Sequence, residues 1–164
     1  MQFTSTDGAA FELRPTGYEY PATNTPGDWD ANWLIVHGQV HTAAGESWTF
    51  HDPSLTTWEA RELHRWLQRT ARGRVEPTDN PGEDAADVLA FTEPNLAFSV
   101  ASVIDGETVL RVHLSLEAVA SKPGWTRETG PRLYEYSVLL KLDQRQLRAA
   151  ATQWSHDISP FPPR

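Results

Sequence analysis

Three histidines are the first residues whose chemistry needs weighing, because imidazole is a common ligand for zinc. His37 and His41 lie four residues apart in a run that alternates like a β-strand, and His51 follows in the next such run. Side chains four residues apart on one strand are separated by roughly 13 Å along the backbone, which is too far for them to share one ion. We therefore predict surface histidines and no metal site.

Carboxylates offer a second chemistry, since glycoside hydrolases place two Asp or Glu side chains across the scissile bond. Asp28, Asp30 and Glu93 are candidates for such a pair, with Trp29 and Trp33 as rings on which a sugar would stack. With 22 acidic residues in the chain, however, such pairs arise easily by chance. No nucleophile elbow, phosphate-binding glycine loop or paired-histidine helix accompanies them. A hydrolase is thus an alternative, and we expect a protein that is not an enzyme and needs no cofactor.

The densest group of these residues is a seven-residue run, Asp28-Trp29-Asp30-Ala31-Asn32-Trp33-Leu34. It follows a Pro-Gly turn signal and leads into the apolar residues 33–36, so it is a loop that enters a strand. Asp and Asn side chains commonly bond the backbone of such turns, and Trp side chains commonly pack in cores. We predict a structural motif in which Trp29 or Trp33 is largely buried and Asp30 or Asn32 bonds to backbone.

Apolar periodicity predicts the elements around this motif. Two helices are expected, over 57–72 and 144–155, because Thr56 with Glu59 and Asp143 with Gln146 match the capping box. Strands are expected over 11–20, 33–42, 46–51, 88–92, 95–104, 107–117 and 134–142. The order β-β-β-α-β-β-β-β-α predicts an α+β fold, with one antiparallel sheet of about six to seven strands and two helices.

The length of the turn between strands 95–104 and 107–117 can be predicted from which residues, even- or odd-numbered, are apolar on each strand. Even-numbered residues are apolar on both 95–104 and 107–117, and a two-residue turn would pair even positions with odd ones. A three-residue loop, Ile104-Asp105-Gly106, with Gly106 in the left-handed conformation fits the pattern better.

The length of 164 residues fits a single domain over 1–164, with exposed loops at about 74–87 and 121–132 and an extended proline-rich tail over 157–164. The chain has no cysteine, which excludes disulfides and thiolate catalysis. The first residues lack a basic start followed by an apolar run, and no segment reaches the length of a membrane span. We expect a cytoplasmic protein that does not bind membranes.

Charge indicates the kind of partner. The net charge of −8 opposes binding to nucleic acid and favours fast association with a basic protein. Acidic residues gather in the 74–87 loop, and arginines recur on one face of the first predicted helix. The loop acids are Glu76, Asp79, Glu83, Asp84 and Asp87, and the arginines are Arg61, Arg65, Arg69 and Arg72.

Four groups of residues in the first two thirds of the chain together resemble the WapI family of bacterial immunity proteins. They are Phe11-Glu12-Leu13 with Gly17-Tyr18; the Asp28–Leu34 run; Leu55-Thr56-Thr57 with Glu59, Glu62 and Leu63; and Glu93-Pro94-Asn95-Leu96 with Phe98. The resemblance implies a small cytoplasmic protein that protects a cell from the toxin domain of a wall-associated, contact-dependent polymorphic toxin, which in the best-known case is a tRNase. It implies no functional residues.

The resemblance and the charge together predict an immunity-type protein that binds a cognate basic toxin domain, with the acids of the 74–87 loop in the contact. The competing class is a carbohydrate- or small-ligand-binding module that uses Trp29, Trp33, Trp48 and Trp125 as stacking platforms. Buried tryptophans would exclude that alternative, and an exposed flat row of them would favour it.

Overall fold

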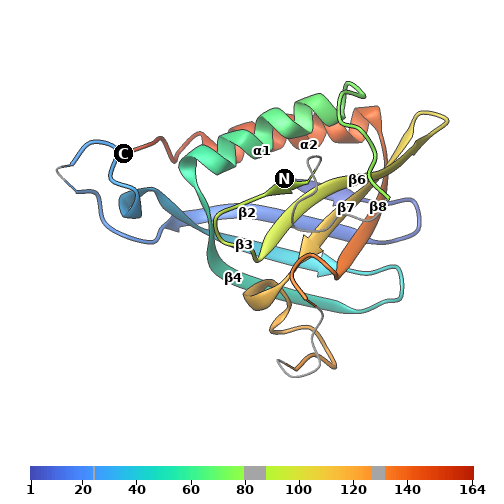
Figure 1. Cartoon of the computed structure of the whole chain (residues 1–164), viewed down its shortest axis with the longest axis horizontal. Coiled ribbons are helices and arrows are strands. Elements are labelled where there is room, and N and C mark those ends of the chain that lie inside the picture. The colour runs from blue at the N-terminus through green and yellow to red at the C-terminus, as the bar shows by residue number, and fades with distance from the viewer. Residues whose placement is uncertain (24, 80–87, 127–131) are drawn as a thin grey trace.

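The structure is a computed structural model that describes residues 1–23, 25–79, 88–126 and 132–164. Eight strands, two α-helices and two short 3-10 helices follow one another along these residues (Figure 1). In chain order they are β1 (Gln2–Thr4), β2 (Ala10–Tyr18), η1 (Asp30–Asn32), β3 (Trp33–His41), β4 (Ser47–Thr56), α1 (Thr57–Thr70), β5 (Leu89–Ala90), β6 (Leu96–Ile104), β7 (Glu107–Leu114), η2 (Leu116–Val119), β8 (Ser137–Asp143) and α2 (Gln144–Ile158).

The strands form two antiparallel four-stranded sheets, in the orders β1-β2-β3-β4 and β5-β6-β7-β8. The prediction of α+β with two helices is confirmed, but the prediction of a single sheet is wrong. One face of β2, β3 and β8 is buried, as the alternation indicated, while the first five residues of β6 are buried on both faces. The buried faces of the two sheets pack against each other. The rings of Phe11 on β2 and Phe98 on β6 meet edge to face, with centroids 6.2 Å apart. Alternation fixes which face of a strand is buried but not which sheet the strand joins.

Several strand boundaries differ from the prediction. β1 was not expected, and it pairs with β2 while Met1 and Phe3 enter the core. β4 continues past residue 51 through Pro53, because a bulge at this point lets an edge strand accommodate a proline. β5 is shorter than 88–92. The strands expected over 107–117 and 134–142 stop at 114 and begin at 137, since Leu116 and Tyr134 adopt positive φ angles of 48° and 62°.

The β6–β7 connection is a two-residue turn, so the predicted three-residue loop is wrong. Ile104 pairs with Glu107, and Asp105 and Gly106 both have positive φ, as a type I′ hairpin turn requires. The parity conflict is real, but a bulge between Val100 and Ser102 resolves it by inserting one extra residue. Leu96, Phe98 and Val100 of β6 therefore face the core with even-numbered residues of β7, whereas Ile104, beyond the bulge, is 65% exposed.

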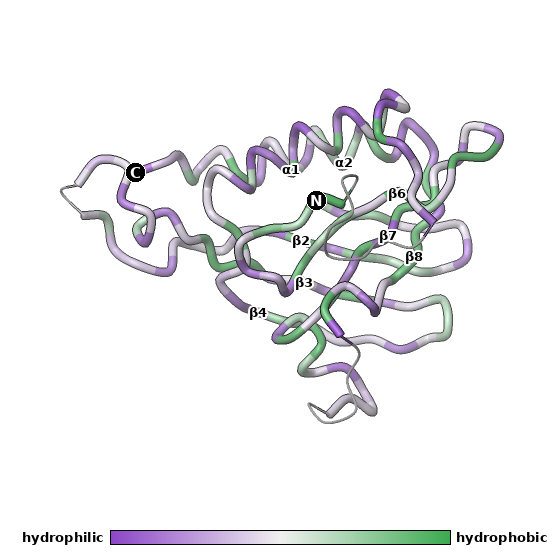
Figure 2. Tube along the Cα trace, in the orientation of Figure 1, coloured by the Kyte–Doolittle hydropathy of each residue, from purple (hydrophilic) through white to green (hydrophobic). Residues whose placement is uncertain are grey.

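Both predicted capping boxes are confirmed. The Thr56 hydroxyl accepts a hydrogen bond from the Glu59 amide, and the Glu59 carboxylate accepts one from the Thr56 amide. Asp143 and Gln146 make the same reciprocal pair at the start of α2. The helices lie side by side along one side of the sheets (Figure 1), and the Trp154 indole of α2 donates to the carbonyl of Ala60 on α1 at 2.7 Å. Hydrophobic and hydrophilic stretches alternate along both helices (Figure 2), because only one face of each is buried.

The segment after α2 is extended and packs on the first sheet. Helix α2 continues to Ile158, so this tail begins later than the predicted residue 157. The ring of Phe161 meets that of Tyr18 on β2 edge to face at 5.5 Å. No helix among the described residues is both long and apolar enough to cross a membrane.

Candidate functional site

Asn32 is the centre of the Asp28–Leu34 motif, and it is fully buried. Its Oδ1 accepts hydrogen bonds from the Thr57 hydroxyl at 2.7 Å and from the Arg164 amide at 2.9 Å. Its Nδ2 donates to the carbonyl of Asp28 at 2.7 Å and to that of Arg164 at 3.0 Å. One amide thus joins the loop before β3, the start of α1 and the C-terminal tail, which confirms that Asn32 bonds to backbone.

The tail is held at the same end of the molecule by further contacts (Figure 1). The Arg164 guanidinium lies 3.3 Å from the centre of the Tyr18 ring and donates to the carbonyl of Tyr20. The Gly27 amide donates to the backbone oxygen of Arg164 at 3.0 Å. The motif therefore positions the tail against the loop that precedes β3.

The two tryptophans of the motif lie in different environments. Trp29 is 50% exposed and stacks on Trp58 of α1, with ring centroids 5.3 Å apart and planes inclined by 27°. Trp33 is partly buried. The fully buried member of the motif is Asn32, so the structural role of this segment rests on the amide more than on the indoles.

The tryptophans expected to form a sugar platform do not form a flat row. Trp48 is buried in the core and its indole donates to the carbonyl of Ala118 at 2.8 Å. Trp125 is partly buried and packs edge-on against Tyr136. The exposed Trp29 stacks on another indole. These positions weaken the carbohydrate-binding alternative.

Three carboxylates from distant parts of the chain interact through their charges: Asp52 of β4, Glu93 before β6 and Glu117 of η2. Partial burial, reinforced by the charge of Glu117, raises the pKa of Asp52, while a hydrogen bond from Asn95 opposes that rise. Partial burial, followed by the charges of Glu117 and Asp52, raises the pKa of Glu93. No Lys or Arg forms an ion pair with this carboxylate cluster in the described part of the chain.

The structure therefore groups Glu93 differently from the hydrolase alternative. The neighbouring charges of Glu93 are those of Glu117 and Asp52, whereas Asp30 acts on the hydroxyl of Tyr20. Sequence reasoning missed Asp52 and Glu117, since nothing local marks residues that meet through three separate elements.

Only part of the predicted acidic loop is described. Glu76 and Asp79 are exposed, and the segment that carries them is fixed to the second sheet, because Thr78 donates its amide to Val100 and accepts a hydrogen bond from Arg111 at its carbonyl. Glu83, Asp84 and Asp87 lie outside the described residues, as do 127–131 of the predicted 121–132 loop.

The histidines are arranged across strands. His37 of β3 lies directly opposite His51 of β4, while His41 bonds to the hydroxyl of Ser47 at 2.6 Å. No group of three potential metal ligands lies together among the residues that the structure describes.

A serine and a histidine do meet, but in the core. The Ser99 hydroxyl lies 2.9 Å from Nε2 of His113, and Nδ1 of His113 lies 2.8 Å from the carbonyl of Tyr134. Both side chains are buried, so no substrate reaches the hydroxyl. Since a carbonyl only accepts, Nδ1 carries the proton and Nε2 accepts from Ser99.

Burial of His113 makes stability depend on pH. Desolvation lowers its folded-state pKa despite the bond to Tyr134. As pH falls below about 6.5, the unfolded chain binds this proton before the folded protein does, so we expect stability to fall by up to about 1.4 kcal/mol per pH unit. Urea unfolding from pH 8 to 5 checks this. The variant His113→Gln should lose much of the dependence, and an equally steep profile would contradict the assignment.

Comparison with known proteins identifies the family. A model of the Immunity protein WapI-like family matches residues 2–162, nearly the whole chain. The chain belongs to the WapI-like immunity protein family. No curated protein and no solved structure matches it.

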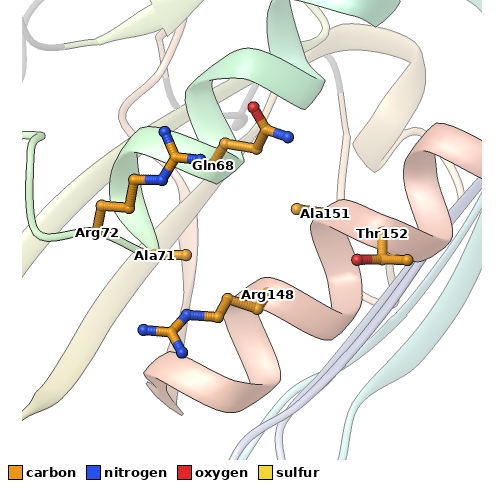
Figure 3. Close-up of a pocket in the computed structure, with 6 residues that line it drawn as sticks. All are labelled: Gln68, Ala71, Arg72, Arg148, Ala151 and Thr152. Carbon is orange, nitrogen blue, oxygen red and sulfur yellow. The ribbon is translucent and has the colours of Figure 1, made fainter.

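The helical side of this WapI-like immunity protein is basic, in contrast to its net charge. Half of the 14 Lys and Arg residues lie on the two helices or just after α1: Arg61, Arg65, Arg69, Arg72, Arg74, Arg145 and Arg148. A groove of about 300 Å³ runs between the helices, lined by Gln68, Ala71, Arg72, Arg148, Ala151 and Thr152 (Figure 3). Its two arginines make it unsuited to a basic partner, so the helical side offers a control surface for tests of binding.

Proposed function

We propose that this WapI-like immunity protein neutralises a basic toxin domain, such as a nuclease, by stoichiometric binding in the cytoplasm and without catalysis. Membership of the immunity family supports a toxin partner. The observation that carries the choice of a basic partner is the carboxylate cluster of Asp52, Glu93 and Glu117, in which like charges interact and no Lys or Arg of the described residues forms an ion pair.

The raised pKa values of Asp52 and Glu93 mean that ionising these groups costs free energy in the folded protein. A cationic side chain of a partner would remove that cost by supplying the missing opposite charge. Binding to a basic protein would then be favoured and binding to nucleic acid opposed, because phosphates carry the same sign as the cluster.

We propose that the acidic segment that begins at Glu76 extends this surface, through Glu76, Asp79, Glu83, Asp84 and Asp87. Five acids in one loop attract a basic partner over distances of about a Debye length, which speeds encounter more than it prolongs the complex.

Association kinetics with the toxin domain encoded beside this protein test the proposal. Two sets of variants are compared at low and high salt: Glu83→Lys, Asp84→Lys and Asp87→Lys combined, and Asp52→Asn, Glu93→Gln and Glu117→Gln combined. Each set should slow association about tenfold at low salt and reduce its salt dependence. The neutral cluster variant should also be at least as stable as wild type at pH 7, since the ionised carboxylates destabilise the fold.

Charge reversal on the helical side, Arg72→Glu with Arg148→Glu, is the matched control and should not slow association. An on-rate that is unchanged by both sets would place the contact elsewhere. Absence of any complex with the toxin would overturn the immunity proposal. Toxin recovered intact and active after the complex is dissociated would agree with stoichiometric inhibition, and covalently altered toxin would contradict it.

A further inference from the structure

Two tryptophans lie outside the hydrophobic core and stack on each other at the surface. Trp29 is 50% exposed, Trp58 is partly exposed, and neither belongs to the cluster of core side chains. Neither indole N–H donates a hydrogen bond within the residues that the structure describes. A Trp side chain has about 150–250 Å² to bury, so this pair leaves unused much of the stabilisation that a core position would supply.

The two elements that carry the pair are bonded to each other. Trp29 precedes the 3-10 helix η1 and Trp58 lies in the first turn of α1. The Asn32–Thr57 hydrogen bond of 2.7 Å joins these two elements, and Thr57 directly precedes Trp58 in the chain. Rings fixed before binding lose little conformational entropy when a partner arrives, which is a property of residues that dominate binding energies.

Acidic groups adjoin the pair. Asp30 follows Trp29 in the chain, is exposed, and its carboxylate has no hydrogen bond or ion pair in the described part of the chain. Tyr20 is 47% exposed. The negative charges of Glu19 and Asp30 raise the pKa of its hydroxyl. The surface therefore combines an aromatic face with negative charge.

We propose that this aromatic patch, made of Tyr20, Trp29 and Trp58 with Glu19 and Asp30, is the anchor of the toxin contact and receives an arginine side chain of the partner over the exposed indole. The inference rests on the proposed function. To the carboxylate cluster and the acidic segment it adds an aromatic anchor and the chemistry of the group that enters it.

A guanidinium suits this surface for two reasons. Its flat cation stacks on the electron-rich face of an indole, the most favourable ring for such contacts, and its N–H groups match neighbouring carboxylates. The same end of the molecule already holds one guanidinium in this way, since Arg164 lies 3.3 Å from the Tyr18 ring centre and donates to the carbonyl of Tyr20.

The first test measures affinity for the toxin domain encoded beside this protein. Trp29→Ala should raise Kd about 30-fold, mainly through faster dissociation, as expected for an anchor at the centre of an interface. Trp29→Phe keeps a stacking ring and should raise Kd less. Trp125→Ala removes a partly buried tryptophan that lies outside the patch, and should change Kd less than threefold.

A thermal melt of each variant separates binding from folding, and half-exposed Trp29 should tolerate replacement. Wild-type affinity in folded Trp29→Ala and Trp58→Ala would overturn the inference while leaving the proposed function in place.

The second test does not depend on the toxin. Indole N–H signals of protein labelled with ¹⁵N are followed by NMR while a short peptide carrying two arginines is added, and Trp29→Phe and Trp58→Phe assign the two signals of the pair. These two signals should move, and the same peptide with glutamines should leave them unchanged. Such shifts without a toxin complex would support the patch and count against the proposed function. Equal responses to both peptides, or none, would overturn the inference.

Discussion

Replacing Asn32 by Ala should lower the free energy of unfolding by about 3 kcal/mol. The change removes the oxygen that accepts hydrogen bonds from the Thr57 hydroxyl and the Arg164 amide, at a partly buried site. It also removes the donor to the carbonyl of Asp28 and one of the two donors to the backbone oxygen of Arg164. Each buried polar group left unsatisfied costs about 1–3 kcal/mol, although water entering the space of the lost amide offsets part of the sum. Urea unfolding at pH 7 measures the loss.

The same variant should release the C-terminal tail, because Asn32 binds both backbone groups of Arg164. Limited proteolysis should therefore cut the 159–164 segment faster than in wild type. Gln39→Ala on the exposed side of β3 is the control and should change neither measurement. Unchanged stability in Asn32→Ala would show that the four hydrogen bonds contribute nothing net.

Replacing Gly38 by Ala should also cost about 3 kcal/mol, at the upper end of the range for overpacking. Gly38 of β3 is paired with Phe50 of β4, and the phenyl ring lies over the glycine. A Cβ at residue 38 would stand 2.0 Å from the ring carbon Cζ of Phe50. The ring is 5% exposed, so it has little room to move aside.

Gly17→Ala is the matched control on the neighbouring strand, since a Cβ there meets no atom within 4 Å and the backbone is not left-handed. It should leave the unfolding midpoint close to that of wild type. A Gly38→Ala protein as stable as the control would mean that the Phe50 ring has another place to pack. Restoration of stability by Phe50→Leu in the Gly38→Ala background would confirm that the clash is with this ring.

Helix ends were predictable because their determinants are local. Thr56 with Glu59 and Asp143 with Gln146 satisfy each other's backbone within three residues, so the sequence alone contains the whole interaction. Strand pairing depends on residues far apart in the chain. The division into two sheets is decided by contacts such as that of Phe11 with Phe98, which no local pattern contains.

The β6–β7 hairpin shows an intermediate case. Asp105-Gly106 is a strong signal for a two-residue turn, and the parity of the flanking residues argued correctly that one residue was in excess. The excess residue lies in a bulge four residues from the turn. The even-odd pattern of apolar residues reveals that one residue is inserted, but it does not show where along the strand the insertion lies.

The candidate site was predictable only where one segment contained it. The Asp28–Leu34 run was singled out from its composition, and Asn32 proved to be its central residue. The carboxylate cluster was not foreseen, because Asp52, Glu93 and Glu117 come from three elements and only the fold brings them together. The stacking of Trp29 on Trp58 is long-range in the same sense.

The edge strands of the two sheets determine whether this protein can pair with strands of other molecules. β1 and β5 have three and two residues, β4 is interrupted by a bulge beside Pro53, and the Lys141 amide of β8 is bonded to the Ser5 hydroxyl. Short, kinked or covered edges resist the growth of a sheet by addition of another chain's strand. We therefore expect the protein to accumulate to the concentrations that the proposed stoichiometric inhibition requires with little edge-to-edge aggregation, and its specific contacts to be made by side chains.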